Sequence, residues 1–256
     1  TADGAMEGSI ELGNQSLYIQ KMLRGMPLDE PELQRARQAA TDALRRVEQG
    51  KLIDASALGT LNLHEQAYQQ QQEKLLTLYR TFTGVDRALR ASSERMSRLS
   101  TQLEVIGDGA VESLTRSPDQ AISWNGGLAT RWQAADGGME ANIGFLRQLY
   151  ALEKMQSEGP TPAIQAELTE ANRFYQEAVD GMLATGLFDV PGEGEFAGQS
   201  LSTQYRALLA DSTRLTSEWI AALTDYQRQL ALYESSAEQL KQALVEVETQ
   251  GDATVE

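Results

Sequence analysis

The sequence predicts an all-α protein, and two observations lead to this prediction. Apolar side chains recur at steps of three and four residues over most of the chain, which is the spacing of a helix face that packs against a core. Runs of β-branched residues and regular alternation between apolar and polar residues, both typical of strands, are missing. We therefore expect helices throughout and no sheet.

The longest apolar pattern runs from Leu201 to Val247 and contains neither proline nor glycine. A helix of this length is typical of a coiled coil or an elongated bundle, because most helices of globular proteins have about 8–20 residues. A second long pattern begins near Leu61 and ends near Gly107–Gly109 or shortly before Pro118. The sequence therefore predicts two long helices.

Four shorter helices are expected in two pairs, and each pair is separated by a break rich in proline and glycine. Asp29 is the expected N-cap of the second helix, with Pro31 in its first turn and Gly50 as its C-cap. The two breaks are Gly25–Pro31 and Gly159–Pro162. The four helices are expected at about residues 9–24, 30–49, 119–157 and 162–187.

Each half of the chain thus has the order helix, break, helix, loop and long helix. We expect an elongated molecule in which the six helices form two stacked four-helix bundles and the two long helices span both. The shorter helices are expected to pass from one bundle to the other at their breaks. One module then comprises about residues 1–25, 84–157 and 225–256, and the other about residues 28–83 and 160–224.

Composition excludes several classes of function. The formal net charge of −15 argues against nucleic acids and anionic membrane surfaces as partners, since both need clustered Lys and Arg. The chain has no cysteine and one histidine, His64, so that thiolate or histidine metal sites and a Ser-His-Asp triad are not expected. No apolar run approaches the ~20 residues that cross a bilayer. We identify no catalytic residue, metal site or cofactor.

The six-helix layout resembles the helical bimodular sensor domain of bacterial chemoreceptors and sensor histidine kinases, and the likeness in architecture and length extends over essentially the whole chain. The resemblance implies the periplasmic portion of an inner-membrane receptor, with transmembrane helices outside this chain before the first helix and after the last. It also implies a homodimer. The module that holds both ends of the chain is then the membrane-proximal one.

Members of this family that sense di- and tricarboxylates bind them in the membrane-proximal bundle. They use basic residues three apart on the first helix and an arginine on the last helix. Lys21 and Arg24 have this spacing, which puts both on one helix face, and Arg228 lies on the last helix. Lys21 stands where the family pattern has an arginine, so it cannot clamp a carboxylate with two parallel hydrogen bonds.

Counting along the expected helices places further cations near the level of Arg24 and Arg228. Cations in a bundle interior would suit a carboxylate ligand, which they could hold by charge-assisted hydrogen bonds. The alternative is that they are solvated surface residues or are paired with carboxylates one turn away. These further cations are Arg87, Arg90, Arg147 and Lys154.

Tyrosines on the last helix could add hydroxyl groups to this site. Tyr226 and Tyr233 lie within two turns of Arg228, although tyrosines in an apolar stripe are more often part of the core. Short-chain acids occupy the distal bundle in some members of the family. For a distal site the candidates are Tyr175 and Arg206.

The sequence therefore predicts a non-enzymatic sensor domain that binds small organic acids and signals by helix displacement. A second hypothesis is a sensor or structural helical domain that binds a protein partner, such as a periplasmic binding protein. This hypothesis predicts an exposed apolar patch and no stabilisation by small molecules.

Overall fold

The computed structural model describes residues 2–24, 26–50, 53–116 and 127–253. Within these residues there are six α-helices, one short 3-10 helix and no β-strand, and an isolated bridge joins Pro191 to Ser200. The prediction of an all-α protein with six helices is confirmed. The helices are α1 (Ala2–Leu23), α2 (Glu30–Gln49), α3 (Ala55–Thr115), α4 (Leu128–Glu158), α5 (Pro162–Leu183), the 3-10 helix η2 (Gly194–Phe196) and α6 (Leu201–Ala253).

Local signals in the sequence explain where the shorter helices begin and end. The Asp29 carboxylate accepts a hydrogen bond of 3.1 Å from the backbone N–H of Glu32, and Pro31 lies in the first turn, so the N-cap of α2 is the predicted one. Gly50 is the C-cap of α2, also as predicted. Thr161 caps α5 in the same way as Asp29 caps α2.

Some helix boundaries differ from the predicted ones. The helix α1 begins at Ala2, because Gly4 packs against α2 and does not interrupt the helix. The helix α4 begins after Gly127, which has a φ of 94°, and residues 119–126 of the predicted helix lie outside the described part of the chain. Gly137 and Gly138 do not break α4.

Contacts divide the chain into two units. Unit 1 comprises Thr1–Leu78 and Arg228–Glu256, and unit 2 comprises Tyr79–Gln227. Because α3 and α6 each cross a boundary between the two sets of residues, each contributes one segment to unit 1 and one to unit 2. Four helical segments therefore belong to each unit. The stacking of the two bundles stays a prediction.

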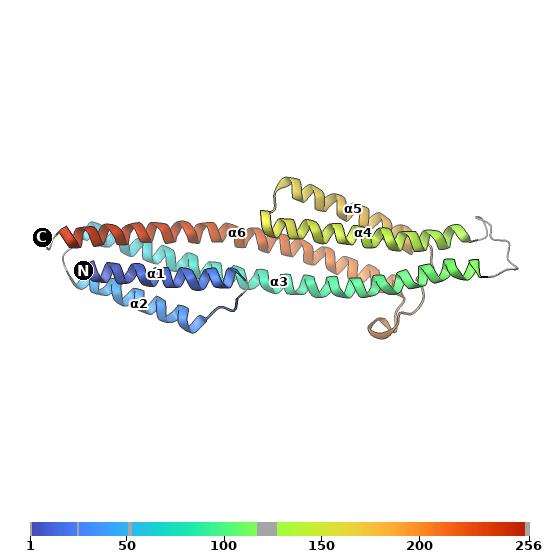
Figure 1. Cartoon of the computed structure of the whole chain (residues 1–256), viewed down its shortest axis with the longest axis horizontal. Coiled ribbons are helices and arrows are strands. Elements are labelled where there is room, and N and C mark those ends of the chain that lie inside the picture. Colours follow the sequence, from blue (N-terminus) through green and yellow to red (C-terminus); the bar gives the residue numbers. More distant parts are fainter. Residues whose placement is uncertain (1, 25, 51–52, 117–126, 254–256) are drawn as a thin grey trace. The chain divides into compact units, whose positions relative to one another are not determined.

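The shorter helices form two antiparallel hairpins, one in each unit (Figure 1). In unit 1, a Cβ atom at Gly4, near the start of α1, would lie 3.0 Å from Cγ2 of Val47, near the end of α2. This grouping differs from the predicted modules, which assigned the first two helices to different bundles. Because α1 and α2 both belong to unit 1, the chain stays within one unit between them; Gly25 of the predicted break lies outside the described residues.

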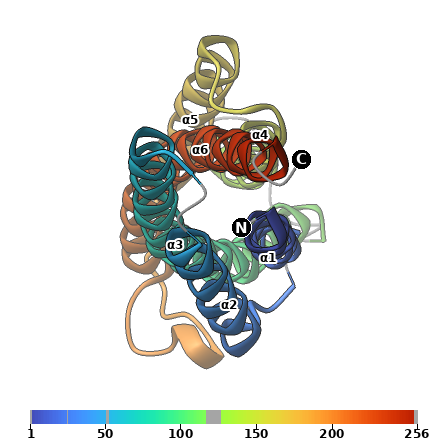
Figure 2. The same ribbon diagram turned by 90° about the vertical axis from the view of Figure 1, so that its left-hand side faces the viewer.

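In unit 1 the four segments of α1, α2, α3 and α6 surround a common interior (Figure 2). Hydrogen bonds tie them together across this interior. Gln15 on α1 donates to the carbonyl oxygen of Ala36 on α2 (3.3 Å), and the Tyr68 and Tyr233 hydroxyls of α3 and α6 lie 3.1 Å apart. The starting end of α1 and the final end of α6 lie at the same end of unit 1 (Figure 1).

Unit 2 has two clusters of buried apolar side chains. One lies around the hydroxyl pair of Tyr175 and Tyr205, whose oxygen atoms are 2.8 Å apart. The other contains Phe82 and Trp219, whose ring centroids are 5.7 Å apart, and the Trp219 indole N–H donates to Asp86 at 2.9 Å. Both clusters join residues of α3, α4, α5 and α6.

The helices α4 and α5 approach each other along a seam of small residues on α4. A Cβ atom at Gly137 would lie 2.9 Å from Cβ of Met182, and one at Gly144 would lie 2.8 Å from Cα of Tyr175. The buried face of α4 also contains Phe145, Leu152 and Met155, whereas several other large apolar side chains of this helix lie outside the core. Ile143, Leu146 and others on α4 are exposed.

We predict opposite effects for two glycine substitutions. Gly144→Ala should lower the free energy of unfolding by about 1–3 kcal/mol, because the new methyl group overlaps the α5 backbone. Gly84→Ala on α3 meets no atom within 4 Å and should raise the free energy of unfolding by roughly 0.5–1 kcal/mol, since alanine favours a helix. Urea denaturation measures both, and equal effects would contradict the close approach of α4 to α5.

Candidate functional site

The structure places the predicted ligand-binding cations on the surface of the protein. They are also divided between the units, since Lys21, Arg24 and Arg228 belong to unit 1 and the others to unit 2. Their role in binding stays a prediction. The exposed ones are Lys21, Arg24, Arg87, Arg90, Arg228 and Arg206 of the distal pair, whereas Lys154 is half-buried.

Some of these cations already have partners in the protein. Arg90 forms an ion pair with Asp86, 2.8 Å away on the same helix, and Lys154 forms one with Glu167 of α5, also at 2.8 Å. The ammonium group of Lys21 lies 5.6 Å from the centre of the Tyr18 ring. Arg90 thus has the local partner that the alternative interpretation expected.

The tyrosines named in the sequence analysis are core residues. Tyr226 stacks on Phe82 with ring centroids 5.6 Å apart, and Tyr233 is buried beside Tyr68. Tyr175 is buried too, and burial together with the neighbouring Tyr205 raises its pKa far above the ordinary value. Tyr175 meets Tyr205 and not the exposed Arg206, so the proposed distal pair is not brought together.

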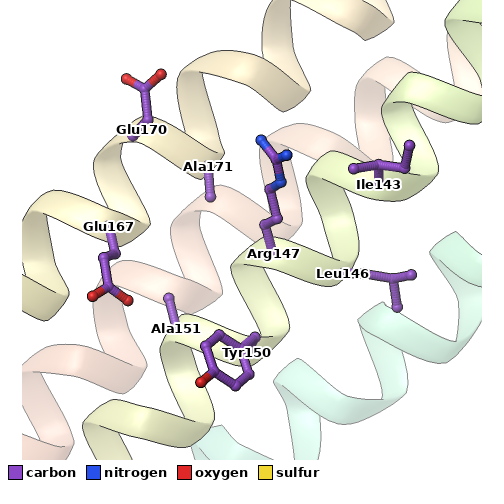
Figure 3. Close-up of a pocket in the computed structure, with 8 residues that line it drawn as sticks. All are labelled: Ile143, Leu146, Arg147, Tyr150, Ala151, Glu167, Glu170 and Ala171. Atoms are coloured by element: carbon purple, nitrogen blue, oxygen red, sulfur yellow. The ribbon is translucent and has the colours of Figure 1, made fainter.

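A groove of about 500 Å³ lies between α4 and α5 in unit 2 (Figure 3). Its apolar part comes mainly from Ile143, Leu146 and Tyr150, which are 41%, 57% and 62% exposed. These residues follow the three-four spacing of a packed helix face, but they lie on the side of α4 away from its small-residue seam. The remaining lining residues are Arg147, Ala151, Glu167, Glu170 and Ala171.

The carboxylates that line this groove are engaged by cations other than Arg147. Lys154 donates to both oxygen atoms of Glu167, at 2.8 and 2.9 Å, and this hydrogen bond raises the pKa of Lys154. Arg173 donates to Glu170 at 2.6 Å, which lowers the pKa of Glu170. Each carboxylate is thus largely neutralised by its own partner.

Arg147 is the cation that this arrangement leaves available. Its guanidinium group extends from α4 toward α5 and lies 4.9 Å from the centre of the Phe174 ring (Figure 3). Within the described part of the chain no carboxylate lies within ion-pair distance of Arg147. An apolar groove with one available guanidinium group suits a small acid with an apolar body.

Unit 1 contains a buried polar cluster that the sequence analysis did not identify. Gln72 is fully buried and donates to the Gln15 side chain at 3.2 Å and to the Tyr68 hydroxyl at 3.0 Å. Arg37 donates through Nε to the Gln72 side-chain oxygen. Because the hydrogen bonds of this cluster fix particular atoms opposite one another, it can specify the register of the four segments.

A small cavity of about 20 Å³ lies beside this cluster and is lined by Arg37, Glu65 and Tyr68, among others. The Nη2 atom of Arg37 is buried and has no hydrogen-bond partner among the residues that the structure describes. A space of this size holds about one water molecule, which could satisfy the donor. Burial raises the pKa of Glu65, an effect opposed by the Thr41 hydroxyl.

The raised pKa of Glu65 predicts a pH-dependent stability. A carboxyl group whose pKa is higher in the folded chain than its ordinary value of 4.5 stabilises the fold below that value, and the contribution is lost as the pH rises through the raised pKa. The unmodified chain should therefore lose stability relative to Glu65→Gln as the pH rises from about 4 to 7. The difference in free energy of unfolding, variant minus unmodified chain, should increase over this range. Chemical denaturation at both pH values measures this difference.

The matched control for this experiment is Glu73→Gln, which changes an exposed side chain on the same helix. We expect its difference from the unmodified chain to stay nearly constant over the same pH range. A constant difference for Glu65→Gln as well would contradict a raised pKa for Glu65.

Three further findings are absences. Across residues 2–24, 26–50, 53–116 and 127–253, no three side chains of the types His, Cys, Asp and Glu are placed to hold a metal ion. None of the helices described contains a stretch apolar and long enough to span a bilayer. A scan against models of protein families and searches of curated proteins and of solved structures found no match to this chain.

Proposed function

We propose that this chain is the ligand-binding domain of a transmembrane receptor, and that its ligand is a small organic acid with an apolar body. The Arg147 guanidinium group in the α4–α5 groove carries this proposal. It would hold the carboxylate, while Ile143, Leu146 and Tyr150 would cover the apolar part of the ligand. The proposal keeps the ligand class expected from the sequence and moves the site to unit 2.

The continuity of α3 and α6 supports a role in signal transmission. Each of these helices contributes to the core of unit 2 and also to the polar cluster of unit 1. A ligand that changes the packing of unit 2 can therefore act on the same helices that build unit 1. Displacements of about 1–2 Å are the scale of such changes. We propose that the receptor acts as a homodimer in the periplasm, with the common end of α1 and α6 toward the membrane.

We predict that Arg147→Ala weakens the binding of phenylacetate at least about tenfold. A hydrogen bond to a charged group contributes roughly 1.5–3 kcal/mol, which corresponds to this factor or more. Calorimetric titration of the whole chain measures the dissociation constant. The matched control is Arg214→Ala, which removes an exposed cation of unit 2 that is paired with Asp211 and Glu218 on its own helix and does not line the groove.

Two results would contradict the proposed site. One is equal binding of phenylacetate by the Arg147→Ala variant and the unmodified chain. The other is binding of citrate but not phenylacetate, with loss of citrate binding in Arg24→Ala or Arg228→Ala. This second result would support the tricarboxylate site that the resemblance implies.

The exposed apolar side chains of α4 favour a second candidate function, which is binding of a protein partner. Large exposed apolar patches on a soluble surface often mark interaction sites. Ile143, Leu146 and Tyr150 have the spacing with which a second helix could pack along α4. This reading predicts that no small acid stabilises the chain in a thermal-shift screen.

A further inference from the structure

A second groove, of about 550 Å³, lies between α3 and α4 in unit 2. It is formed by different residues of α4 from those that line the α4–α5 groove. Half of its lining residues are apolar and half are acidic. They are Glu104, Asp108, Val111 and Glu112 on α3, and Trp132, Ala135, Asp136 and Met139 on α4.

The apolar part of this groove exposes large side chains to solvent. Trp132 is 53% exposed and Met139 is 55% exposed. The two helices are fixed close together beside them, because a Cβ atom at Gly107 would lie only 3.1 Å from the Cα atom of Ala135. The groove is therefore bounded by two helices in backbone contact, and the Trp132 ring is accessible to a ligand.

The charged side chains that line the groove are all acidic. Glu104, Asp108 and Asp136 form no ion pair within the described part of the chain, and Glu112 pairs with the exposed Arg116 at 2.7 Å. Neighbouring Arg131 donates to the carbonyl oxygen of Ala110 and to the Ser113 hydroxyl and forms no ion pair with the lining carboxylates. Glu104 and Asp108 are one helical turn apart, a spacing at which like charges repel.

The distances between these carboxylates indicate which class of cation the groove could bind. Within the described residues they are not close enough together to hold a metal ion. A larger cation with an apolar body meets both parts of the groove, since its charge would lie among the carboxylates and over the Trp132 ring. A ring face attracts ammonium and guanidinium groups, and a quaternary ammonium group matches an aromatic and methionine surface best.

We propose that the α3–α4 groove binds an organic cation that carries an apolar group, of the alkyl- or arylammonium class. The proposal is independent of the acid site, because Arg147 and the residues around it take no part in it. The two grooves of unit 2 thus favour ligands of opposite charge.

The test uses the whole chain and the aryl quaternary ammonium ion benzyltrimethylammonium, with tryptophan fluorescence as the readout. The Trp132→Phe variant keeps the two other tryptophans, Trp124 and the buried Trp219, so loss of the signal in this variant assigns it to the groove. We expect saturable binding that weakens at least tenfold in the double variant Asp108→Asn, Asp136→Asn. The matched control removes two exposed acids in unit 1 by Glu73→Gln and Glu234→Gln, and it should bind within about twofold of the unmodified chain.

The neutral probe benzyl alcohol separates charge recognition from apolar binding. We expect it to bind at least tenfold more weakly than benzyltrimethylammonium. The proposal is overturned by equal binding of the two probes, by unchanged binding in the Asp108→Asn, Asp136→Asn variant, or by no saturable fluorescence change up to millimolar concentrations. Equal losses in the groove variant and the control variant would also overturn it, because they would show a response to net charge alone.

Discussion

The structure depends on one constraint, which is that α3 and α6 must satisfy the packing of two units at once. In unit 2 these helices bury apolar side chains such as Phe82 and Trp219. In unit 1 the same helices place Tyr68, Gln72 and Tyr233 opposite one another. An axial shift of either helix would therefore disturb an apolar core in one unit and a hydrogen-bonded cluster in the other. Through such coupled packing, a structural change caused by ligand binding could pass from one set of residues to another.

The packing of α4 against α5 also affects the surface of unit 2. The small residues of α4 face α5, and Gly137 and Gly144 permit backbone contact that larger residues would prevent. Large apolar residues on the outward faces of α4, such as Trp132 and Ile143, line two grooves. Within the described residues, one groove contains an arginine without a carboxylate partner, and the other contains Glu104, Asp108 and Asp136, which form no ion pair. The packing of one hairpin thus determines the chemistry of both grooves.

Much of the fold was predictable from the sequence, because it depends on local signals. The long helices follow from the spacing of apolar residues, and the start of α2 follows from Asp29 and Pro31. The pairing of the helices was not predictable in the same way. A break such as Gly25–Pro31 shows that a helix ends, but its residues do not show whether the chain continues forward or turns back.

The candidate sites depend on contacts between helices, and this is why the sequence analysis found only parts of them. The sequence does not show which of the α4 cations Arg147 and Lys154 has a carboxylate partner. Only the structure shows that Glu167 on α5 forms an ion pair with Lys154. Likewise, Ile143 has the spacing of a core residue, but it is exposed, and glycines and alanines make up much of the buried face of α4. The polar cluster around Gln72 has no motif, since its members come from three separate helices and Tyr68 links it to Tyr233 on a fourth.

We propose that ligand binding in the α4–α5 groove acts on unit 1 through α3 and α6. Hydrogen exchange tests this coupling most directly. Backbone exchange would be measured on the whole chain with and without saturating phenylacetate, with Arg147→Ala as the control. We expect altered exchange in α4 and α5 and also around Gln72 and Tyr233 in unit 1, with neither change in the control. Altered exchange confined to α4 and α5 would contradict the proposed coupling to unit 1.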